Sequence, residues 1–334
     1  MTRVGIVGYR GYSGAELIHL LKRHPHVETV LMDHREDPGG PPAIRRSASP
    51  LRIACTGEAV SQQQLALVFL ATPPDVSMEL APVMLSAGAR VVDLSGAFRL
   101  RTPENYTAWY KETHTQPELL AEAVYGLPEF SRAGIATARL LSNPGCYPTA
   151  ANLAIWPLVE AGVIDRAAGL VCDAKSGVSG AGRKPSLKTS FCEVTENFSA
   201  YSILRHRHVP EVLQISKLEE SEFSFTAQLL PLDRGILETI YFKAPTLNSA
   251  DDLLAIYEKQ YAAEPFVRLF NPPHMPDLRS VAHTNFCDIG VTFDSRTKRA
   301  VVVSAIDNLV KGAAGQAIQN MNLMLGYPET EALL

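Results

Sequence analysis

The sequence VGIVGYRGYSG occupies residues 4–14 and joins an apolar run to a turn that contains three glycines. A helical pattern follows from Ala15, so the turn lies between a strand and a helix. Glycine at these turn positions lets the main chain approach a pyrophosphate, whose charge the start of the helix stabilises. The spacing differs from the commoner G-x-G-x-x-G, and a tight turn without a ligand is the competing interpretation. The position between strand and helix favours a dinucleotide site. The residues of this predicted site are Gly8, Gly11, Tyr12, Ser13 and Gly14.

The first half of the chain alternates short apolar runs with helical patterns. Runs of strand length occur at Val27–Met32, Leu67–Ala71 and Arg90–Leu94. Strands that are apolar on both faces and alternate with helices are typical of a parallel sheet covered on both sides. The first domain is therefore predicted to be an α/β Rossmann dinucleotide-binding domain.

The pattern changes after about Cys146. Longer stretches with partial alternation occur at Ser224–Leu230, Glu238–Lys243 and Ala300–Ala305. Fewer helical patterns separate them, which predicts an α+β domain on a mostly antiparallel or mixed sheet. The last segment, Val310–Leu325, has the pattern of an amphipathic helix.

Length and composition limit the classes of protein. The 334 residues suit two domains, and 46% hydrophobic residues suffice for a core without metal or disulfide support. A net charge of −4 and the lack of a basic tract argue against a nucleic-acid or membrane partner. The sequence has no signal-peptide pattern and no apolar run near the roughly 20 residues that span a bilayer. Five scattered cysteines without CxxC spacing argue against disulfides and a zinc site. A reducing, cytoplasmic location and no bound metal are therefore expected.

The end of the second predicted strand bears on the choice of cofactor. An acid there holds the ribose hydroxyls of NAD, whereas an arginine pairs with the additional phosphate of NADP. Asp33 and Arg35 supply both types of side chain. Arg35 lies further into the loop and favours NADP, with an ordinary solvated arginine as the alternative.

The sequence SNPGCYPT, residues 142–149, contains the strongest candidate for a nucleophile. A helical pattern follows it, and Pro148 suits a first helical turn, where a missing N–H costs nothing. Cys146 is therefore expected at or next to the helix N-cap, where free N–H groups and the helix dipole stabilise a thiolate. The same N–H groups can hold an oxyanion on an attacked carbonyl. A buried structural cysteine is the alternative, and the polar neighbours Asn143 and Thr149 favour the nucleophile.

Thiolate chemistry needs a group that accepts and returns protons near neutral pH, and histidine suits this best. The sequence HRHVPE, residues 206–211, groups two histidines, an arginine and a carboxylate. Glu211 follows His208 by three residues, close enough on a turn to fix the ring tautomer as in a catalytic triad. The candidate catalytic residues are Cys146, His208 and Glu211, and either His206 or His208 can be the main acid/base.

Two further segments carry groups that suit anions. Small residues at 173–184, flanked by basic side chains, can form an anion nest from consecutive N–H groups, with a plain flexible loop as the alternative. The sequence DLSGAFR, residues 93–99, ends a predicted strand, where α/β folds bind ligands. It offers Arg99 for a phosphate or a carboxylate.

Together these motifs resemble the N-acetyl-γ-glutamyl-phosphate reductase family of arginine biosynthesis, which is related to aspartate-semialdehyde dehydrogenase. The resemblance covers nearly the whole chain, and SNPGCYPT and HRHVPE are its most specific parts. It also includes the glycine turn and the sequences DLSGAFR (93–99), VYGLPE (124–129), SGVSGAGRKP (176–185) and DNLVKGAAGQAIQN (307–320).

The resemblance implies an organisation into two domains. An NADP-binding Rossmann domain is expected over residues 1–145, completed by a C-terminal helix over residues 308–334. A catalytic and oligomerisation domain is expected over residues 146–307, in a homodimer or homotetramer. The segment after the second strand departs from the arginine- and serine-rich pattern usual in the family, which bears on the NADP preference and not on the reaction.

The resemblance also implies roles for individual residues. Cys146 is expected to be the nucleophile and His208 the acid/base. The residues expected near the cofactor are Ser179, Gly180, Gly182 and Asn308. Those expected near the substrate are Arg99, Asn143 and His206.

The expected activity is the NADPH-dependent reduction of N-acetyl-γ-glutamyl phosphate to the semialdehyde and phosphate, through a thioester on Cys146. One alternative is the same chemistry on a carrier-protein-linked aminoadipyl phosphate of lysine biosynthesis. An alternative of another class is a regulator that senses dinucleotides without catalysis. A simple alcohol or hydroxyacid dehydrogenase would leave SNPGCYPT unexplained.

Overall fold

A computed structural model describes residues 1–34 and 50–334 of the chain, which fall into two compact units. Unit 1 comprises Met1–Pro103, Thr113–Asn143 and Ala317–Leu334, and unit 2 comprises Glu104–Glu112 and Pro144–Gln316. Among the described residues, none of the helices combines the length and the apolar character needed to cross a membrane.

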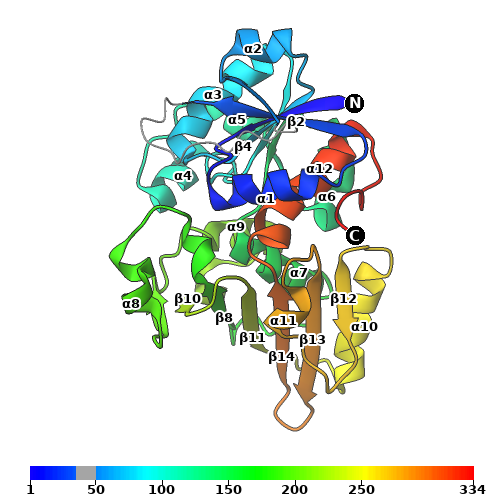
Figure 1. Ribbon diagram of the computed structural model, residues 1–334. Helices are drawn as coiled ribbons and strands as arrows, with labels where there is room; N and C mark the ends of the chain where they lie inside the picture. Colours follow the sequence, from blue (N-terminus) through cyan, green and yellow to red (C-terminus); the bar gives the residue numbers. More distant parts are fainter. Residues whose placement is uncertain (35–49) are drawn as a thin grey trace. The chain divides into compact units, whose positions relative to one another are not determined.

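Unit 1 is built on a seven-stranded parallel sheet with the strand order β3-β2-β1-β4-β5-β7-β6 (Figure 1). The order reverses between β1 and β4, and in such folds dinucleotides bind at this reversal, beyond the carboxyl ends of the strands. The predicted α/β Rossmann architecture is confirmed. The helices and strands of unit 1 are β1 (Thr2–Val7), α1 (Tyr12–Leu21), β2 (Val27–Asp33), β3 (Leu51–Ala54), α2 (Gly57–Gln62), β4 (Leu67–Leu70), α3 (Pro74–Ser86), β5 (Arg90–Asp93), α5 (Pro117–Glu122), β6 (Val124–Tyr125), α6 (Pro128–Thr137), β7 (Leu140–Ser142) and, from residue 317 on, α12 (Gly315–Leu325).

The central strands of this sheet are apolar because helices cover both faces. Every residue of β4 is buried, and so are Val4, Ile6 and Val7 of β1. The C-terminal helix α12 is linked to the segment that follows α1, where His24 Nε2 and Asn322 Oδ1 are 3.0 Å apart. The last helix of the chain, from Ala317 on, is thus part of the same unit as the first strands.

The first helix begins earlier than its apolar pattern predicts. Gly11 is the N-cap of α1, and the main-chain N–H of Ala15 donates to the Gly11 carbonyl oxygen at 2.9 Å. The helix therefore starts at Tyr12, three residues before the predicted start at Ala15, and takes in the last glycine of the turn. Its N-terminus lies directly at the glycine turn.

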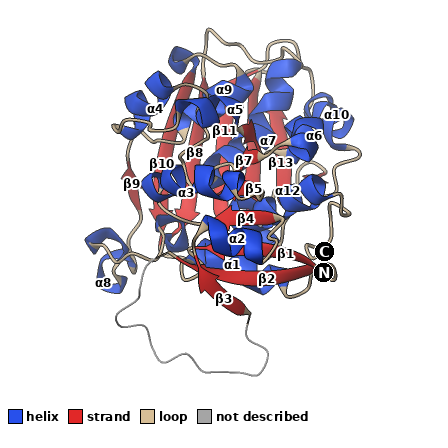
Figure 2. Cartoon of the chain, turned by 90° about the horizontal axis from the view of Figure 1, so that it is seen from above, coloured by secondary structure: helices blue, strands red, loops and turns tan. Residues whose placement is uncertain are grey.

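Unit 2 is built on a mixed seven-stranded sheet with the strand order β12-β13-β14-β11-β8-β10-β9, whose strands run side by side in Figure 2. The pairs β8–β10 and β12–β13 are parallel, and the others are antiparallel. The predicted mixed sheet of an α+β domain is confirmed. The helices and strands of unit 2 are α4 (Pro103–Tyr110), α7 (Cys146–Glu160), β8 (Leu170–Gly177), α8 (Phe191–Val194), β9 (Ser199–Tyr201), α9 (Val209–Ser216), β10 (Phe223–Leu230), β11 (Ile236–Lys243), α10 (Ala250–Tyr261), β12 (Val267–Phe270), α11 (Leu278–Val281), β13 (Cys287–Asp294), β14 (Arg299–Ile306) and the π-helix η4 (Val310–Ala314).

The prediction of a single amphipathic helix over Val310–Leu325 is wrong in two respects. The segment begins as the π-helix η4 and continues as α12. Its polar side chains are buried as well: Lys311, Gln316, Gln319, Asn320 and Asn322 have no exposed surface. Polar groups tolerate burial where partners satisfy them, as when Asn320 Nδ2 donates to the Gly126 carbonyl oxygen at 2.8 Å within unit 1.

Candidate active site

Cys146 is the first residue of α7, directly after the N-cap Gly145. The carbonyl oxygen of Gly145 accepts hydrogen bonds from the main-chain N–H of Thr149 at 3.0 Å and from its hydroxyl at 2.9 Å, which begin the helix. The predicted helix start at Cys146 is confirmed. The first N–H groups of a helix have no acceptor within it, and with the helix dipole they stabilise negative charge on the sulfur.

Glu211 holds the main chain next to this cysteine. It lies in the first turn of α9 and has no exposed surface. One of its carboxylate oxygens accepts a hydrogen bond from the N–H of Gly145 at 2.9 Å. This contact gives Glu211 a place at the start of α7, in addition to the role toward His208 that the sequence suggests.

His206 and His208 lie together before α9, with ring centroids 4.8 Å apart and both rings buried. The main-chain N–H of His208 donates to Nδ1 of His206 at 3.2 Å, so neutral His206 carries its proton on Nε2. Burial, and next the charge of Arg207, lower the pKa of His206 to about 4. His206 is therefore neutral at neutral pH and cannot deliver a proton there as an imidazolium ion.

A cavity of about 610 Å³ within unit 2 brings several predicted residues together. Cys146, Gly180, His206 and His208 all line it. Its size is ordinary for a site that binds a small molecule. The cavity also includes residues that the sequence did not single out, because nothing local distinguishes them: Lys188, Tyr201 and Arg205.

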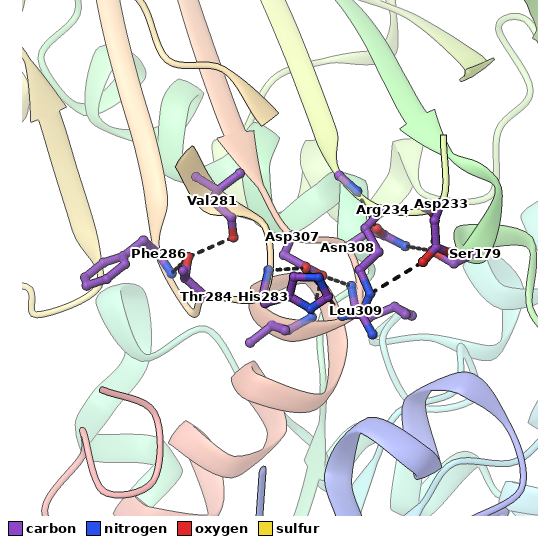
Figure 3. A network of polar contacts seen from close by, with 12 residues as sticks. Ser179, Asp233, Arg234, Val281, His283, Thr284, Phe286, Asp307, Asn308 and Leu309 are labelled. Carbon is purple, nitrogen blue, oxygen red and sulfur yellow. Dashed lines mark hydrogen bonds and ion pairs between the residues drawn. The ribbon is translucent and has the colours of Figure 1, made fainter. Parts of the chain in front are cut away.

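Asn308 and Ser179, both predicted near the cofactor, belong to one hydrogen-bonded network in unit 2 (Figure 3). Asn308 Nδ2 donates to Ser179 Oγ at 3.0 Å, and Ser179 Oγ donates to the carbonyl oxygen of Asp233 at 2.6 Å. Asn308 Oδ1 accepts from the N–H of Gly235 at 2.8 Å. These contacts tie the loop that follows β8 to the turn before β11.

The neighbouring Asp307 is part of the same network and was not identified from the sequence. Its fully buried carboxylate accepts from the main-chain N–H groups of His283 at 2.7 Å, Leu309 at 2.8 Å and Val310 at 3.0 Å (Figure 3). Three charge-assisted contacts of this kind fix the entry into η4. Gly182, which the sequence also predicts near the cofactor, lies in the segment that follows β8. Its φ of +81° is a value that favours glycine.

Arg99 and Asn143 lie together in unit 1. Arg99 Nε donates to the carbonyl oxygen of Asn143 at 2.9 Å, and one of its terminal nitrogens donates to the carbonyl oxygen of Leu94 at 3.0 Å. The side chain of Asn143 accepts from Asn320 Nδ2 at 3.1 Å. Both residues are buried, so the strand ends after β5 and β7 are linked by side chains.

The glycine turn has a shape that only glycine permits. Gly8 has a φ of +78°, and a Cβ placed there would lie 2.1 Å from the carbonyl oxygen of Ala71. A Cβ on Gly14 would lie 2.4 Å from the carbonyl oxygen of Gly8. Because glycine has no side chain, the main chain can pack this closely where β1, the turn and the residues after β4 meet.

A cavity of about 230 Å³ within unit 1 opens at this turn. Its lining includes Gly8 after β1, Asp33 at the end of β2 and Thr72 after β4. These are the positions at which a dinucleotide meets a Rossmann sheet, and the turn and the start of α1 fit its pyrophosphate. Arg35, the predicted contact for the additional phosphate of NADP, lies outside the described residues.

Comparison with known proteins agrees with both units. Residues 3–138 match the semialdehyde dehydrogenase NAD binding domain, and residues 146–308 match the semialdehyde dehydrogenase dimerisation domain. The N-acetyl-gamma-glutamyl-phosphate reductase of Symbiobacterium thermophilum is 48% identical over 99% of this chain and 97% of its own length. The enzyme of the same name from Desulforudis audaxviator is 46% identical over 100% of this chain and 98% of its own length.

The chain belongs to the N-acetyl-gamma-glutamyl-phosphate reductase family. The resemblance recognised in the sequence is thereby confirmed, and the NAD-binding domain of this family identifies a nicotinamide dinucleotide as the cofactor. Solved structures of more distant proteins share the fold. Aspartate semialdehyde dehydrogenase II from Vibrio cholerae is 18% identical, with a TM-score of 0.72 over 97% of this chain and 98% of that one. Aspartate semialdehyde dehydrogenase with NADP from Candida albicans is 17% identical, with a TM-score of 0.69 over 97% of this chain and 98% of that one.

Proposed function

We propose that this family member catalyses the NADPH-dependent reduction of N-acetyl-γ-glutamyl phosphate to N-acetylglutamate semialdehyde and phosphate, and that Cys146 is the nucleophile. The observation that carries the proposal is the position of Cys146 at the start of α7, on a cavity that also contains His206 and His208. The activity follows from the name of relatives that are up to 48% identical over nearly the full chain.

The first chemical step uses the sulfur of Cys146. The thiolate attacks the carbonyl carbon of the acyl phosphate, a C–S bond forms, the C–O bond to phosphate breaks, and inorganic phosphate leaves. The N–H groups of the first turn of α7 stabilise the thiolate before the attack and the oxyanion during it. The thioester matters because a carboxylate is a poor hydride acceptor.

The second part of the reaction releases the aldehyde. When bound, NADPH supplies the hydride that reduces the thioester carbon. Breaking the C–S bond returns the sulfur of Cys146, and a neighbouring acid/base moves the proton. His208 has this role in the proposal, because His206, with a pKa of about 4, is not protonated at neutral pH.

The remaining assignments are part of the same proposal. The turn residues Gly8, Gly11, Tyr12, Ser13 and Gly14 hold the cofactor, together with Arg35, Ser179, Gly180, Gly182 and Asn308. The substrate is held by Arg99, Asn143 and His206, and Glu211 completes the catalytic group. NADP as the preferred dinucleotide draws support from the solved Candida albicans structure, which contains NADP.

The proposed domains are residues 1–145 with 308–334 for the cofactor, and residues 146–307 for catalysis and oligomer contacts. The family-model matches to residues 3–138 and 146–308 support this division. The description of the second match as a dimerisation domain supports a homodimer or homotetramer. The proposed location is the cytoplasm, where a nucleophilic cysteine stays reduced.

The test replaces Cys146 by serine. Cys146→Ser is expected to abolish the NADPH-dependent reduction of the acyl phosphate while NADPH binding, followed by fluorescence, stays close to that of the wild type. Cys192→Ser is the matched control, because Cys192 is exposed in the same unit and is expected to be dispensable. Substantial turnover by Cys146→Ser would overturn the thioester mechanism.

A further inference from the structure

Arg52 of β3 makes a bidentate contact with the carboxylate at the end of β2. Its Nε and one terminal nitrogen donate to the two oxygens of Asp33 at 3.0–3.2 Å. Arg52 is opposite Leu31 in the parallel pairing of β2 and β3, so its side chain reaches along the strands to their carboxyl ends. Asp33 lines the cavity at the glycine turn, so its partner Arg52 places a positive charge directly beside that lining.

Two residues of the glycine turn complete this cluster. The hydroxyl of Tyr9 donates to Asp33 Oδ1 at 2.6 Å, and a guanidinium nitrogen of Arg10 lies 3.8 Å from the same oxygen. Both guanidinium groups also face the Tyr9 ring, at 5.4 Å for Arg10 and 5.7 Å for Arg52. Burial alone would raise the pKa of Asp33, but the hydrogen bonds from Arg52 and Tyr9 outweigh it and lower that pKa. Asp33 is therefore an anion held by two cations and a hydroxyl.

This arrangement changes what Asp33 can do for a dinucleotide. In Rossmann folds an acid at this position accepts hydrogen bonds from the ribose hydroxyls of NAD, whereas a nearby arginine accommodates the 2′-phosphate of NADP. Here both oxygens of Asp33 already accept hydrogen bonds, from Arg52 and Tyr9. Within the described part of this cluster, two guanidinium groups face one carboxylate, and the excess of one positive charge attracts a phosphate dianion. The planar guanidinium group can also pair with a phosphate through two hydrogen bonds.

We infer that Arg52 selects NADP over NAD in this chain by pairing with the 2′-phosphate of the adenosine ribose, while Asp33 positions its guanidinium group at the cavity rim. The inference rests on the cofactor of the proposed function and adds the residue that recognises it. Arg52 lies on a neighbouring strand and not in the loop directly after β2. The contact inferred here therefore comes from the strand pair β2–β3.

The test uses two nucleotides that lack the nicotinamide, 2′,5′-ADP and 5′-AMP, titrated into the full-length protein by calorimetry. The wild type is expected to bind 2′,5′-ADP at least about tenfold more tightly, as charge-assisted pairing with a phosphate implies. Arg52→Gln is expected to lose most of this preference and to bind 5′-AMP within about twofold of the wild type. Increasing salt is expected to weaken 2′,5′-ADP binding more steeply in the wild type than in Arg52→Gln.

Arg3→Gln is the matched control. Arg3 pairs with Glu28 at 2.9 Å across the strand pair β1–β2, and its side chain is 40% exposed, compared with 47% for Arg52. Arg3 lies at the other end of these strands, so its replacement is expected to keep the preference for 2′,5′-ADP.

An unchanged preference in Arg52→Gln would overturn the inference. An equal loss of both nucleotides would also overturn it, because Arg52 would then support the cavity as a whole. Neither nucleotide carries a hydride or an acyl group, so these outcomes are independent of the Cys146→Ser test. If Cys146→Ser abolishes turnover but Arg52→Gln keeps the preference for 2′,5′-ADP, the proposed reaction stands and only this inference is rejected.

Discussion

The N–H of Gly145 donates to the carboxylate of Glu211 at 2.9 Å, across 66 positions of sequence. Gly145 is the N-cap of α7 and precedes the proposed nucleophile, so this contact links the start of the nucleophile's helix to the first turn of α9. A charge-assisted hydrogen bond inside a fully buried site is strong, and it limits where Cys146 can lie. We therefore expect Glu211 to act through the main chain as a positioning residue, beside its proposed role toward His208.

Replacing Glu211 by alanine is expected to lower kcat on the order of 10- to 100-fold, because small displacements of a reacting group are costly. It is also expected to destabilise the protein by about 1–3 kcal/mol, since a buried N–H loses its acceptor. Glu211→Gln keeps an oxygen that can accept from Gly145, so both losses should be smaller. Measurements of turnover and of urea unfolding test whether Glu211→Gln loses less kcat and less stability than Glu211→Ala.

The exposed Glu220 provides the control for these variants. Glu220→Ala is expected to retain the turnover and the stability of the wild type. Wild-type turnover in Glu211→Ala would show that Gly145 keeps its position without the carboxylate, which would reject the positioning role.

Gly312 of η4 leaves the space that Cys146 occupies. A Cβ on Gly312 would lie 2.8 Å from Cys146 Cβ and 3.2 Å from its Cα. Gly312→Ala is therefore expected to displace the start of α7, to cost about 1–3 kcal/mol through overpacking, and to slow both turnover and alkylation of Cys146 by iodoacetamide. Gly57→Ala is the control, because the atom nearest to its added Cβ is 3.4 Å away. Equal alkylation rates in the two variants would contradict the prediction.

The buried His206 predicts a pH dependence of stability. Burial, and next Arg207, lower its pKa from 6.5 to about 4, so the unfolded chain binds the proton first as the pH falls. The stability from this group is fully present above pH 6.5 and is lost as the pH falls toward 4. Between pH 6.5 and 5.0 the wild type is expected to lose about 1.5 kcal/mol more than His206→Gln, measured by urea unfolding at both values. The exposed His274 supplies the control, because His274→Gln should lose as much unfolding free energy between these pH values as the wild type. An equal loss in His206→Gln and the wild type would contradict the prediction.

The sequence predicts those features whose signals are local. The apolar runs, the glycine turn and the helix after Gly145 were recognised because each depends on residues within a few positions of one another. The sequence predicts the start of α1 three residues late, because the apolar pattern begins at Ala15 whereas the N-cap is Gly11. The polar face of the last helix was expected to be exposed. Its burial depends on partners such as Gly126, which is 194 residues away from Asn320.

In the candidate site, too, the sequence predicts the residues with a local signal and misses those that depend on distant partners. Cys146, His206 and His208 were recognised from two short motifs, and the structure places all three on one cavity. Tyr201 lines that cavity without any local signal of its own. The sequence places Asp33 at the end of the second strand, but its bidentate partner Arg52 lies on the adjacent strand, 19 residues later. A pairing between strands cannot be read from spacing, because it depends on their register in the sheet.

Asn308 can contribute through the fold as well as through the cofactor contact expected for it. Its side chain is almost fully buried, accepts from the N–H of Gly235 at 2.8 Å and donates to Ser179 Oγ at 3.0 Å. Asn308→Ala is expected to cost about 2–4 kcal/mol in urea unfolding, because both partners lose a buried hydrogen bond. Asn308→Asp keeps the acceptor for Gly235 but loses the donor to Ser179 and buries a charge beside Asp307, so it should cost at least as much. Replacement of the exposed Asn271 by alanine should change the stability by less than about 0.5 kcal/mol. A stable Asn308→Ala protein with weakened NADPH binding would reject the structural role and leave only the contact with the cofactor. The predicted loss of stability in Asn308→Ala would show that the network around Asn308 holds the loop after β8 to the turn before β11.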